Sequence, residues 1–261
     1  MKKTMKFSIL SSGSRGNACY VETDDAKILV DAGLSGIEVE RRLAAIGISP
    51  QSLDAIVVTH EHSDHIKGVG ILARRYKLPV YANTQTLKRG EKILGKLPAV
   101  ISVQTGETFE INHLSLETFT KCHDAADPMG LVLSSNGVRM GHVTDLGRST
   151  RLAEDRLSGC SALIMEFNYD PTLLTEGPYP LDLKRRINSS EGHLSNEQAC
   201  ELLETVSHPD LKWVVLAHLS ETNNDAAKAL RAAKNVLDHC GLKATRILIG
   251  KQDEASPLIE I

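Results

Sequence analysis

The chain has 261 residues, with 41% hydrophobic, 24% charged and 4% aromatic side chains, a globular composition that excludes a collagen, a coiled coil and a disordered tail. Its formal net charge of −3 at pH 7 supplies no global positive field, so a nucleic-acid or anionic-membrane partner needs a local basic patch. Ten histidines beside a single tryptophan are the one unusual count.

The N-terminal segment is too poor in apolar residues for a signal peptide. Its apolar run is interrupted by Ser8 and ends at Leu10, whereas a signal peptide needs roughly 7 to 15 apolar residues. No stretch approaches the roughly 20 apolar residues of a membrane span, so no membrane partner is expected. The five cysteines are odd in number and share no short spacing, which argues against a disulfide framework and favours the cytoplasm.

The first third of the chain is predicted to hold short strands separated by Gly, Asn and Asp. A helix is expected at Ser35–Ile46, ending before Gly47, and two more at Ile66–Tyr76 and Thr84–Leu94. The expected strands are Phe7–Leu10, Cys19–Thr23, Lys27–Asp31, Ala55–Thr59 and Pro79–Ala82.

A second strand-rich block follows, and the Asn136-Gly137 pair within it predicts a two-residue hairpin. The expected strands of this block and of the C-terminal part are Val100–Val103, Thr108–Ile111, Leu114–Thr120, Leu131–Ser135, Val138–Thr144, Ala162–Phe167, Trp213–Ala217 and Thr245–Ile249.

The C-terminal third begins with an irregular stretch, residues 170–195, interrupted by Pro and Gly. Ser195 and Gln198 form a capping-box pattern that opens a helix to Val206, and a longer helix is expected from about Asn224 to His239. The pattern as a whole predicts an α/β (α+β) fold, a single domain over residues 1–261 with two packed sheets and helices outside.

The string His60-Glu61-His62-Ser63-Asp64-His65 directly follows an apolar strand. Three imidazoles and a carboxylate that leave a strand end together can face two cations, and divalent metals such as Zn²⁺ and Mn²⁺ take N and O ligands. The alternative is a solvated loop in which Ser63 or Asp64 caps a helix.

This string resembles the signature of the metallo-β-lactamase fold, a four-layer αββα sandwich. Members of that fold add an Asp after an early strand, a lone His, a bridging Asp and a late His. The residues that match, each after an apolar strand, are Asp31, His123, Asp145 and His218.

The resemblance implies two divalent metal ions per chain, Zn²⁺ or Mn²⁺, with a metal-bridging hydroxide as nucleophile. It also implies that Asp31 orients the histidine loop, and that Asp64 both binds metal and orients the hydroxide. The ligands it assigns are His60, His62 and His123 for one ion, Asp64, His65 and His218 for the other, and Asp145 between them.

Two late motifs, Gly192-His193-Leu194-Ser195 and Ala217-His218-Leu219-Ser220, resemble those of fold members that cut phosphodiesters. In those relatives the first His assists the leaving group, so His193 is expected to be catalytic. A loop histidine beside a helix start is its alternative. In a second alternative, His193 is the sixth metal ligand, and His218 contacts the ligands without binding metal itself.

Further segments resemble the YycJ/WalJ group of this fold, almost end to end. That group is described as 5′-to-3′ exonucleases of double-stranded DNA, which implies a DNA substrate. No obligate protein partner is inferred from the sequence. Tyr169 stands where many members carry His. The segments that carry the resemblance are residues 10–18, 123–130, 166–170, 177–187 and 192–196.

Two segments fit a phosphate-rich substrate. Ser14 and Asn17 lie in a Gly/Ser turn whose amides can form an anion-binding nest, with an ordinary hairpin as the alternative. The cationic run Lys184, Arg185 and Arg186 precedes His193 and is expected to contact DNA, with a solvated face as the alternative.

Other functions fit the same ligands. A small-molecule or cyclic phosphodiesterase is the nearest alternative. A thioester hydrolase of the glyoxalase II kind accounts for neither His193 nor the basic run, and a non-catalytic metal-binding protein would be expected to lack a ligand.

Overall fold

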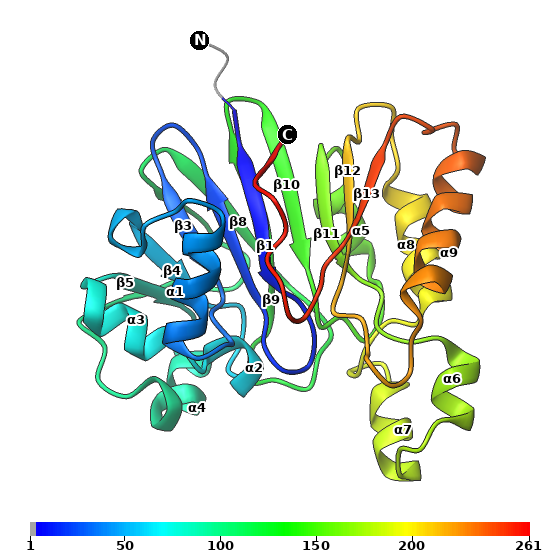
Figure 1. Cartoon of the computed structure of the whole chain (residues 1–261), viewed down its shortest axis with the longest axis horizontal. Coiled ribbons are helices and arrows are strands. Elements are labelled where there is room, and N and C mark those ends of the chain that lie inside the picture. Colours follow the sequence, from blue (N-terminus) through cyan, green and yellow to red (C-terminus); the bar gives the residue numbers. More distant parts are fainter. Residues whose placement is uncertain (1–3) are drawn as a thin grey trace.

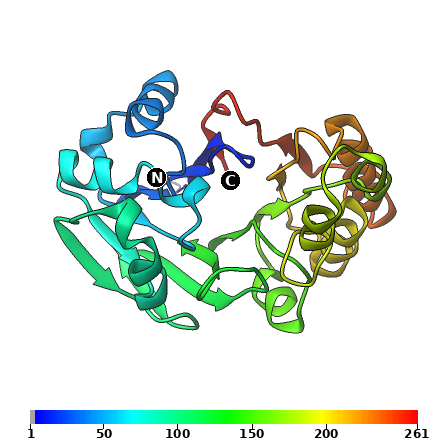
Figure 2. The ribbon, with the colours of Figure 1, turned by 90° about the horizontal axis from the view of Figure 1, so that it is seen from below.

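Two mixed sheets of seven strands each form the centre of the molecule (Figure 1). The computed structural model describes residues 4–261. Seen from below, one group of helices covers the outer face of the first sheet and another group covers that of the second (Figure 2). The four layers run helix, sheet, sheet, helix, which confirms the predicted αββα sandwich.

The first sheet contains the N-terminal strands and is closed at one edge by the C-terminal strand β14, which pairs with β1. In spatial order its strands are β14 (Ile259–Glu260), β1 (Lys6–Ser11), β2 (Ala18–Glu22), β3 (Lys27–Val30), β4 (Ala55–Val57), β5 (Pro79–Ala82) and β6 (Ala99–Ser102).

The second sheet contains the central and late strands. In spatial order they are β13 (Arg246–Ile249), β12 (Trp213–Ala217), β11 (Ala162–Glu166), β10 (Val138–Val143), β9 (Met129–Ser135), β8 (Leu114–Thr120) and β7 (Thr108–Ile111).

The helices fill the connections between strands. They are α1 (Gly36–Ala45), the 3₁₀ turn η1 (Pro50–Ser52), α2 (Ser63–Ile66), α3 (Val69–Tyr76), α4 (Thr84–Leu94), α5 (Arg151–Leu157), α6 (Pro171–Glu176), α7 (Leu181–Ile187), α8 (Asn196–Val206) and α9 (Ala226–His239).

Three apolar clusters hold the layers together. One cluster lies between the two sheets and includes Phe7, Leu116 and Ile164. Each of the other two lies between one sheet and the helices that cover it. Strands β11 and β12 are buried on both faces, which explains their unbroken apolar sequences, because parallel strands covered by helices have no solvated side.

The predicted strands are present, and three expectations about the helices are corrected. The helix expected at 66–76 begins only at Val69, as α3, because Ile66 is the last residue of a separate short helix, α2. The stretch predicted to be irregular after Asp170 holds the short helices α6 and α7. Helix α5 was not expected. Its Thr150 side chain accepts from the Ala153 amide as a proper N-cap, but the helix has only seven residues and shows little periodicity.

Among the described residues, none of the helices combines the length and the apolar character that crossing a membrane requires.

Candidate functional site

The carboxyl ends of strands from both sheets meet at one edge of the sandwich. Parallel strands end together, so the residues that follow β3, β4, β10 and β12 converge there. In Figure 1 this is the lower edge, where α2, α6 and α7 lie.

Three of the predicted site residues adopt a left-handed backbone just after their strands. Asp31, Asp145 and His218 have φ values of 58°, 55° and 55°. For residues other than glycine this conformation costs of order 1 kcal/mol each, so it persists only where the surroundings fix it. The turns aim all three side chains into the same place.

The first cluster consists of three histidines. Ring nitrogens of His60, His62 and His123 lie within 4.8 Å of one another. His62 Nδ1 is 3.2 Å from His123 Nε2, and His123 Nδ1 lies 3.1 Å from the Gly192 carbonyl, to which it donates. His123 Nε2 therefore carries a lone pair that faces His62.

A chain of hydrogen bonds fixes the tautomer of His60. The Thr59 hydroxyl donates to Asp31 Oδ2 at 2.8 Å, so it accepts from His60 Nδ1 at 3.0 Å. Asp31 also accepts from the Thr59 amide and lies 2.7 Å from His65 Nδ1. Asp31 thus contacts His65 directly and His60 through Thr59, an arrangement that can orient both histidines.

The second group surrounds His65 and Asp145. Asp145 Oδ2 lies 3.1 Å from His65 Nε2, and Asp145 Oδ1 lies 3.8 Å from His123 Nε2, so the carboxylate stands between the two groups of histidines. Asp64 Oδ2 is 3.6 Å from His65 Nε2 and 3.9 Å from His218 Nε2.

Glu166, at the end of β11, was not predicted as a site residue. Its side chain is fully buried. Oε1 lies 2.9 Å from His193 Nδ1 and 2.8 Å from His218 Nδ1, and the carboxylate accepts further bonds from the amides of Asp145, Leu146 and Leu194. The one available signal was a carboxylate at the end of an otherwise apolar buried strand.

Burial and charge divide the histidines into two kinds. Burial keeps the pKa of His60 well below its usual value and lowers the pKa of His123 to about 4. Burial opposes protonation of His218 as well, but Asp145 and Glu166 outweigh it and raise the pKa of His218 to about 9. The same competition, won by Asp145 and Asp31, raises the pKa of His65 well above its usual value.

Two buried ring nitrogens of the site lack a hydrogen-bond partner within residues 4–261, His60 Nε2 and His218 Nε2, and Asp145 Oδ2 has only its ion pair with His65. An unpaired buried polar atom costs about 1–3 kcal/mol, so such atoms at the centre of a converging group point to a ligand. Imidazole nitrogens and a carboxylate oxygen are donors for divalent metals, and these residues fit metal binding.

The predicted substrate residues separate into two sets. Ser14 and Arg186 line a cavity of about 240 Å³ beside His193 and His218. Asn17 does not line it; its side-chain amide lies 3.3 Å from Asp64 Oδ2 and 3.1 Å from His65 Nε2.

Lys184 and Arg185, the other two residues of the basic run, do not line this cavity. Lys184 donates to the Thr175 carbonyl at 2.7 Å, and Arg185 is 3.7 Å from Asp182 on the same helix. Arg186 Nε instead lies 2.5 Å from Asp124 Oδ2, beside the histidine cluster. Arg186 is therefore the member of the run at the site.

Tyr169 has a structural role in this chain. It is buried, and its hydroxyl lies 2.6 Å from Asn188 Oδ1, just after α7. Burial raises its pKa to about 12, so the phenol is neutral and holds the loop before His193.

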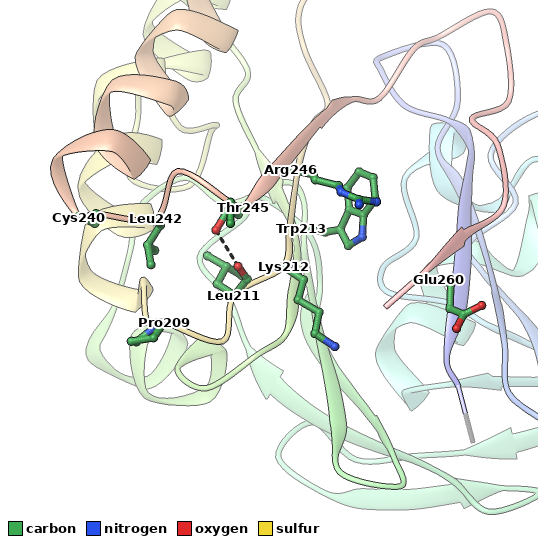
Figure 3. A pocket seen from close by; sticks show the side chains of 11 residues that line it. Pro209, Leu211, Lys212, Trp213, Cys240, Leu242, Thr245, Arg246 and Glu260 are labelled. Atoms are coloured by element: carbon green, nitrogen blue, oxygen red, sulfur yellow. Dashed lines mark hydrogen bonds between the residues drawn. The ribbon is translucent and has the colours of Figure 1, made fainter. Parts of the chain in front are cut away.

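A larger cavity, about 560 Å³, lies at the opposite end of the second sheet (Figure 3). Trp213 and Arg246, which begin β12 and β13, line it, and the Arg246 guanidinium lies 5.3 Å from the Trp213 ring centroid. His218 follows the far end of β12, roughly 16 Å away at 3.3 Å per residue. This cavity contains none of the predicted site residues.

Comparison with known proteins agrees with the geometry. The model of the Beta-lactamase superfamily domain matches residues 26–218. The exodeoxyribonuclease YycJ of Bacillus anthracis is 40% identical over 241 residues, which cover 91% of this chain and 90% of that protein. The exodeoxyribonuclease WalJ of Streptococcus pneumoniae serotype 2 is 38% identical and aligned over 98% of both chains.

The fold has a solved counterpart. The crystal structure of the metallo-β-lactamase fold protein YhfI from Bacillus subtilis matches the whole of both chains with a TM-score of 0.76 at 17% identity. With the αββα layers, the histidine clusters and two relatives aligned over nearly their full length, this chain belongs to the β-lactamase superfamily and, within it, to the family of the exodeoxyribonucleases YycJ and WalJ.

Proposed function

We propose that the protein is a dinuclear metal-dependent exonuclease that degrades double-stranded DNA from the 5′ end. The observation that carries this is the position of Asp145 between two groups of histidines, in which His60 Nε2 and His218 Nε2 have no hydrogen-bond partner among the described residues. Relatives named exodeoxyribonucleases support the DNA substrate.

Two groups of three residues are proposed to bind the metal ions, Zn²⁺ or Mn²⁺, with Asp145 shared. When bound, the ions lower the pKa of water and neutralise charge on the phosphate. The proposed ligands are His60, His62 and His123 for one ion, and Asp64, His65 and His218 for the other.

Two side chains are proposed to serve the reaction directly. Glu166 holds His193 Nδ1, so Nε2 is the nitrogen left to face the substrate in the cavity. An imidazolium held by a buried carboxylate can neutralise or protonate the departing sugar oxygen. Asp64 is proposed to hold the attacking hydroxide in orientation.

The test is a panel of substrates given to the metal-reconstituted enzyme. Duplex DNA labelled at each 5′ end, a cyclic nucleotide and a thioester are compared, with His193→Ala and Asp64→Ala beside the wild type. We expect DNA degradation, reduced about 10²-fold or more in both variants. Turnover of the thioester without degradation of DNA would contradict the proposal, and turnover of the cyclic nucleotide alone would favour a small-molecule phosphodiesterase.

The cytoplasmic location expected from the cysteines remains a prediction.

A further inference from the structure

The cavity of about 240 Å³ beside the histidine clusters is lined by two chemically different kinds of side chain. His193 and His218 belong to the site where the proposed reaction takes place. Tyr179, Leu183 and Ile187 add apolar and aromatic surface. Imidazoles that fit a phosphate, together with an apolar, partly aromatic lining that fits a base, are what a nucleotide site needs.

Helix α7 forms a fixed wall of this cavity. The Ile187 carbonyl accepts from the His193 amide at 2.9 Å, so the helix end is attached to the catalytic loop itself. A Cβ on Gly192 would lie 2.2 Å from the carbonyl oxygens of Arg186 and Ile187, so only glycine permits this close approach.

A second attachment joins α7 to the other side of the site. Arg186 Nε lies 2.5 Å from Asp124 Oδ2, and the Asp124 carbonyl in turn lies 3.2 Å from His62 Nε2. The helix is therefore connected at both flanks to residues of the clusters, and these contacts hold it beside the cavity.

We propose that this cavity receives the terminal nucleoside of the DNA strand. Its base packs against Tyr179, Leu183 and Ile187 while its phosphodiester lies at His193. Because α7 blocks continuation of the strand, only an end can be seated, and this is the reason for exonucleolytic cleavage. The inference rests on the proposed nuclease function.

The size of the cavity supports one nucleoside and no more. Pockets that enclose drug-sized ligands occupy roughly 300–1,000 Å³, and this cavity is smaller. The duplex must therefore stay outside, with its terminal nucleotide unpaired and separated from its complement.

The first test compares two duplexes that differ only in whether the terminal nucleotide carries a base or is abasic. The abasic end keeps the phosphodiester but loses the packing, so we expect kcat/KM to fall about tenfold. Equal rates on the two ends would overturn the nucleoside site while leaving the nuclease function intact. Degradation of neither duplex would overturn both.

The second test fills the cavity. In Leu183→Trp the larger side chain occupies the space for the base, so the rate on the normal end is expected to fall to that of the abasic end, and the two ends become equivalent. Leu181→Trp is the matched control, because Leu181 lies on the same helix, is 62% exposed and does not line the cavity. Its rates and its preference for the normal end should equal those of the wild type.

Covalently closed circular duplex DNA tests the wall directly. It has no end to seat, so we expect it to stay intact under conditions that degrade the same DNA after linearisation. Cleavage of the closed circle would overturn the proposal. Metal content is measured on both tryptophan variants, because a variant that no longer binds metal has lost its folded metal site. If Leu183→Trp retains metal and still prefers the normal end, the assigned lining of the cavity is wrong.

Discussion

Glu166, which was not predicted from the sequence, connects three segments of the site. Its buried carboxylate accepts three backbone amides and lies against His193 and His218. Burial opposes its ionisation, but the two histidines lower its pKa to about 2, so it is an anion at neutral pH. Such a partner fixes the orientation of a ligand histidine and raises its basicity.

Replacing this anion should weaken metal binding. In Glu166→Gln the amide cannot accept from all of these donors, so we expect metal affinity to fall 10- to 100-fold and DNA degradation with it. Metal titration measures the effect. Glu204→Gln on the exposed face of α8 is the control; if Glu166→Gln binds metal as tightly as Glu204→Gln does, Glu166 has no orienting role.

Metal uptake should also release protons. In the metal-free protein the raised pKa values of His65 and His218 keep both protonated at pH 7, whereas His60 and His123 are neutral. A histidine binds metal only after losing its proton, so affinity should rise with pH up to about 9. Calorimetry in buffers of different ionisation enthalpy counts the protons, and uptake without release at pH 7 would contradict these assignments.

The same shift sets how stability depends on pH. For His218 the folded pKa of about 9 exceeds the ordinary value of 6.5, so its stabilising contribution is complete below pH 6.5 and is lost as pH rises to about 9. The Tm of the metal-free protein should therefore fall across this interval, and metal-loaded protein should show less change.

Site residues could be predicted from the sequence where their neighbours in the chain mark them. This holds for the six-residue histidine string and for the residues at strand ends. Glu166 could not be predicted, because its partners come from three segments remote in the chain, and the residue itself looks like an ordinary strand end.

At the scale of elements, the division between α2 and α3 serves the site. The Asp64 carbonyl accepts from the Asn17 amide at 2.7 Å, and the Gly68 amide donates to the Ala32 carbonyl at 2.7 Å, so the bond that would continue the helix is missing. The spacing of apolar residues in the sequence cannot predict this break in the helix, because the replacement hydrogen bonds come from the loops that follow β1 and β3.

Gly33 permits that close approach, since a Cβ there would lie 1.6 Å from the Asp64 carbonyl oxygen. We expect Gly33→Ala to push α2 away and to lower both stability, by about 1–3 kcal/mol, and metal affinity. Gly47→Ala is the control: its added Cβ meets nothing within 4 Å, so only the strain of its φ of 76° remains and metal affinity is retained. Equal metal affinity in the two variants would show that the position of α2 does not depend on the contact between Gly33 and Asp64.

At the scale of the molecule, the C-terminal segment completes the N-terminal half of the site. Gln252 donates to the Ser11 hydroxyl and the Gly16 carbonyl and accepts from the Arg15 amide, so it holds the loop that carries Ser14. The layers could be predicted because every sheet strand of four or more residues has its own apolar pattern. The pairing of β14 with β1 could not be predicted, because a strand of two residues is too short to show an apolar pattern.

Removing this connection should be costly. Gln252→Ala leaves buried groups without partners, and we expect the free energy of unfolding to fall by about 1–3 kcal/mol in urea denaturation. Glu254→Ala, with a side chain 62% exposed, should change it by less than about 0.5 kcal/mol. A loss in Gln252→Ala no larger than in Glu254→Ala would mean that the loop is held by other contacts.

Two metal ions at the rim of the sandwich are proposed to support exonucleolytic cleavage of DNA. Titration of metal-stripped protein with Mn²⁺ or Zn²⁺, while mononucleotide release from 5′-labelled duplex DNA is followed, tests this role of the ions. We predict no release without metal, and activity that saturates at two equivalents per chain with the label appearing first as mononucleotide. Full activity of the stripped protein in chelator, or a metal-saturated enzyme that leaves DNA intact, would contradict a metal-dependent DNA exonuclease.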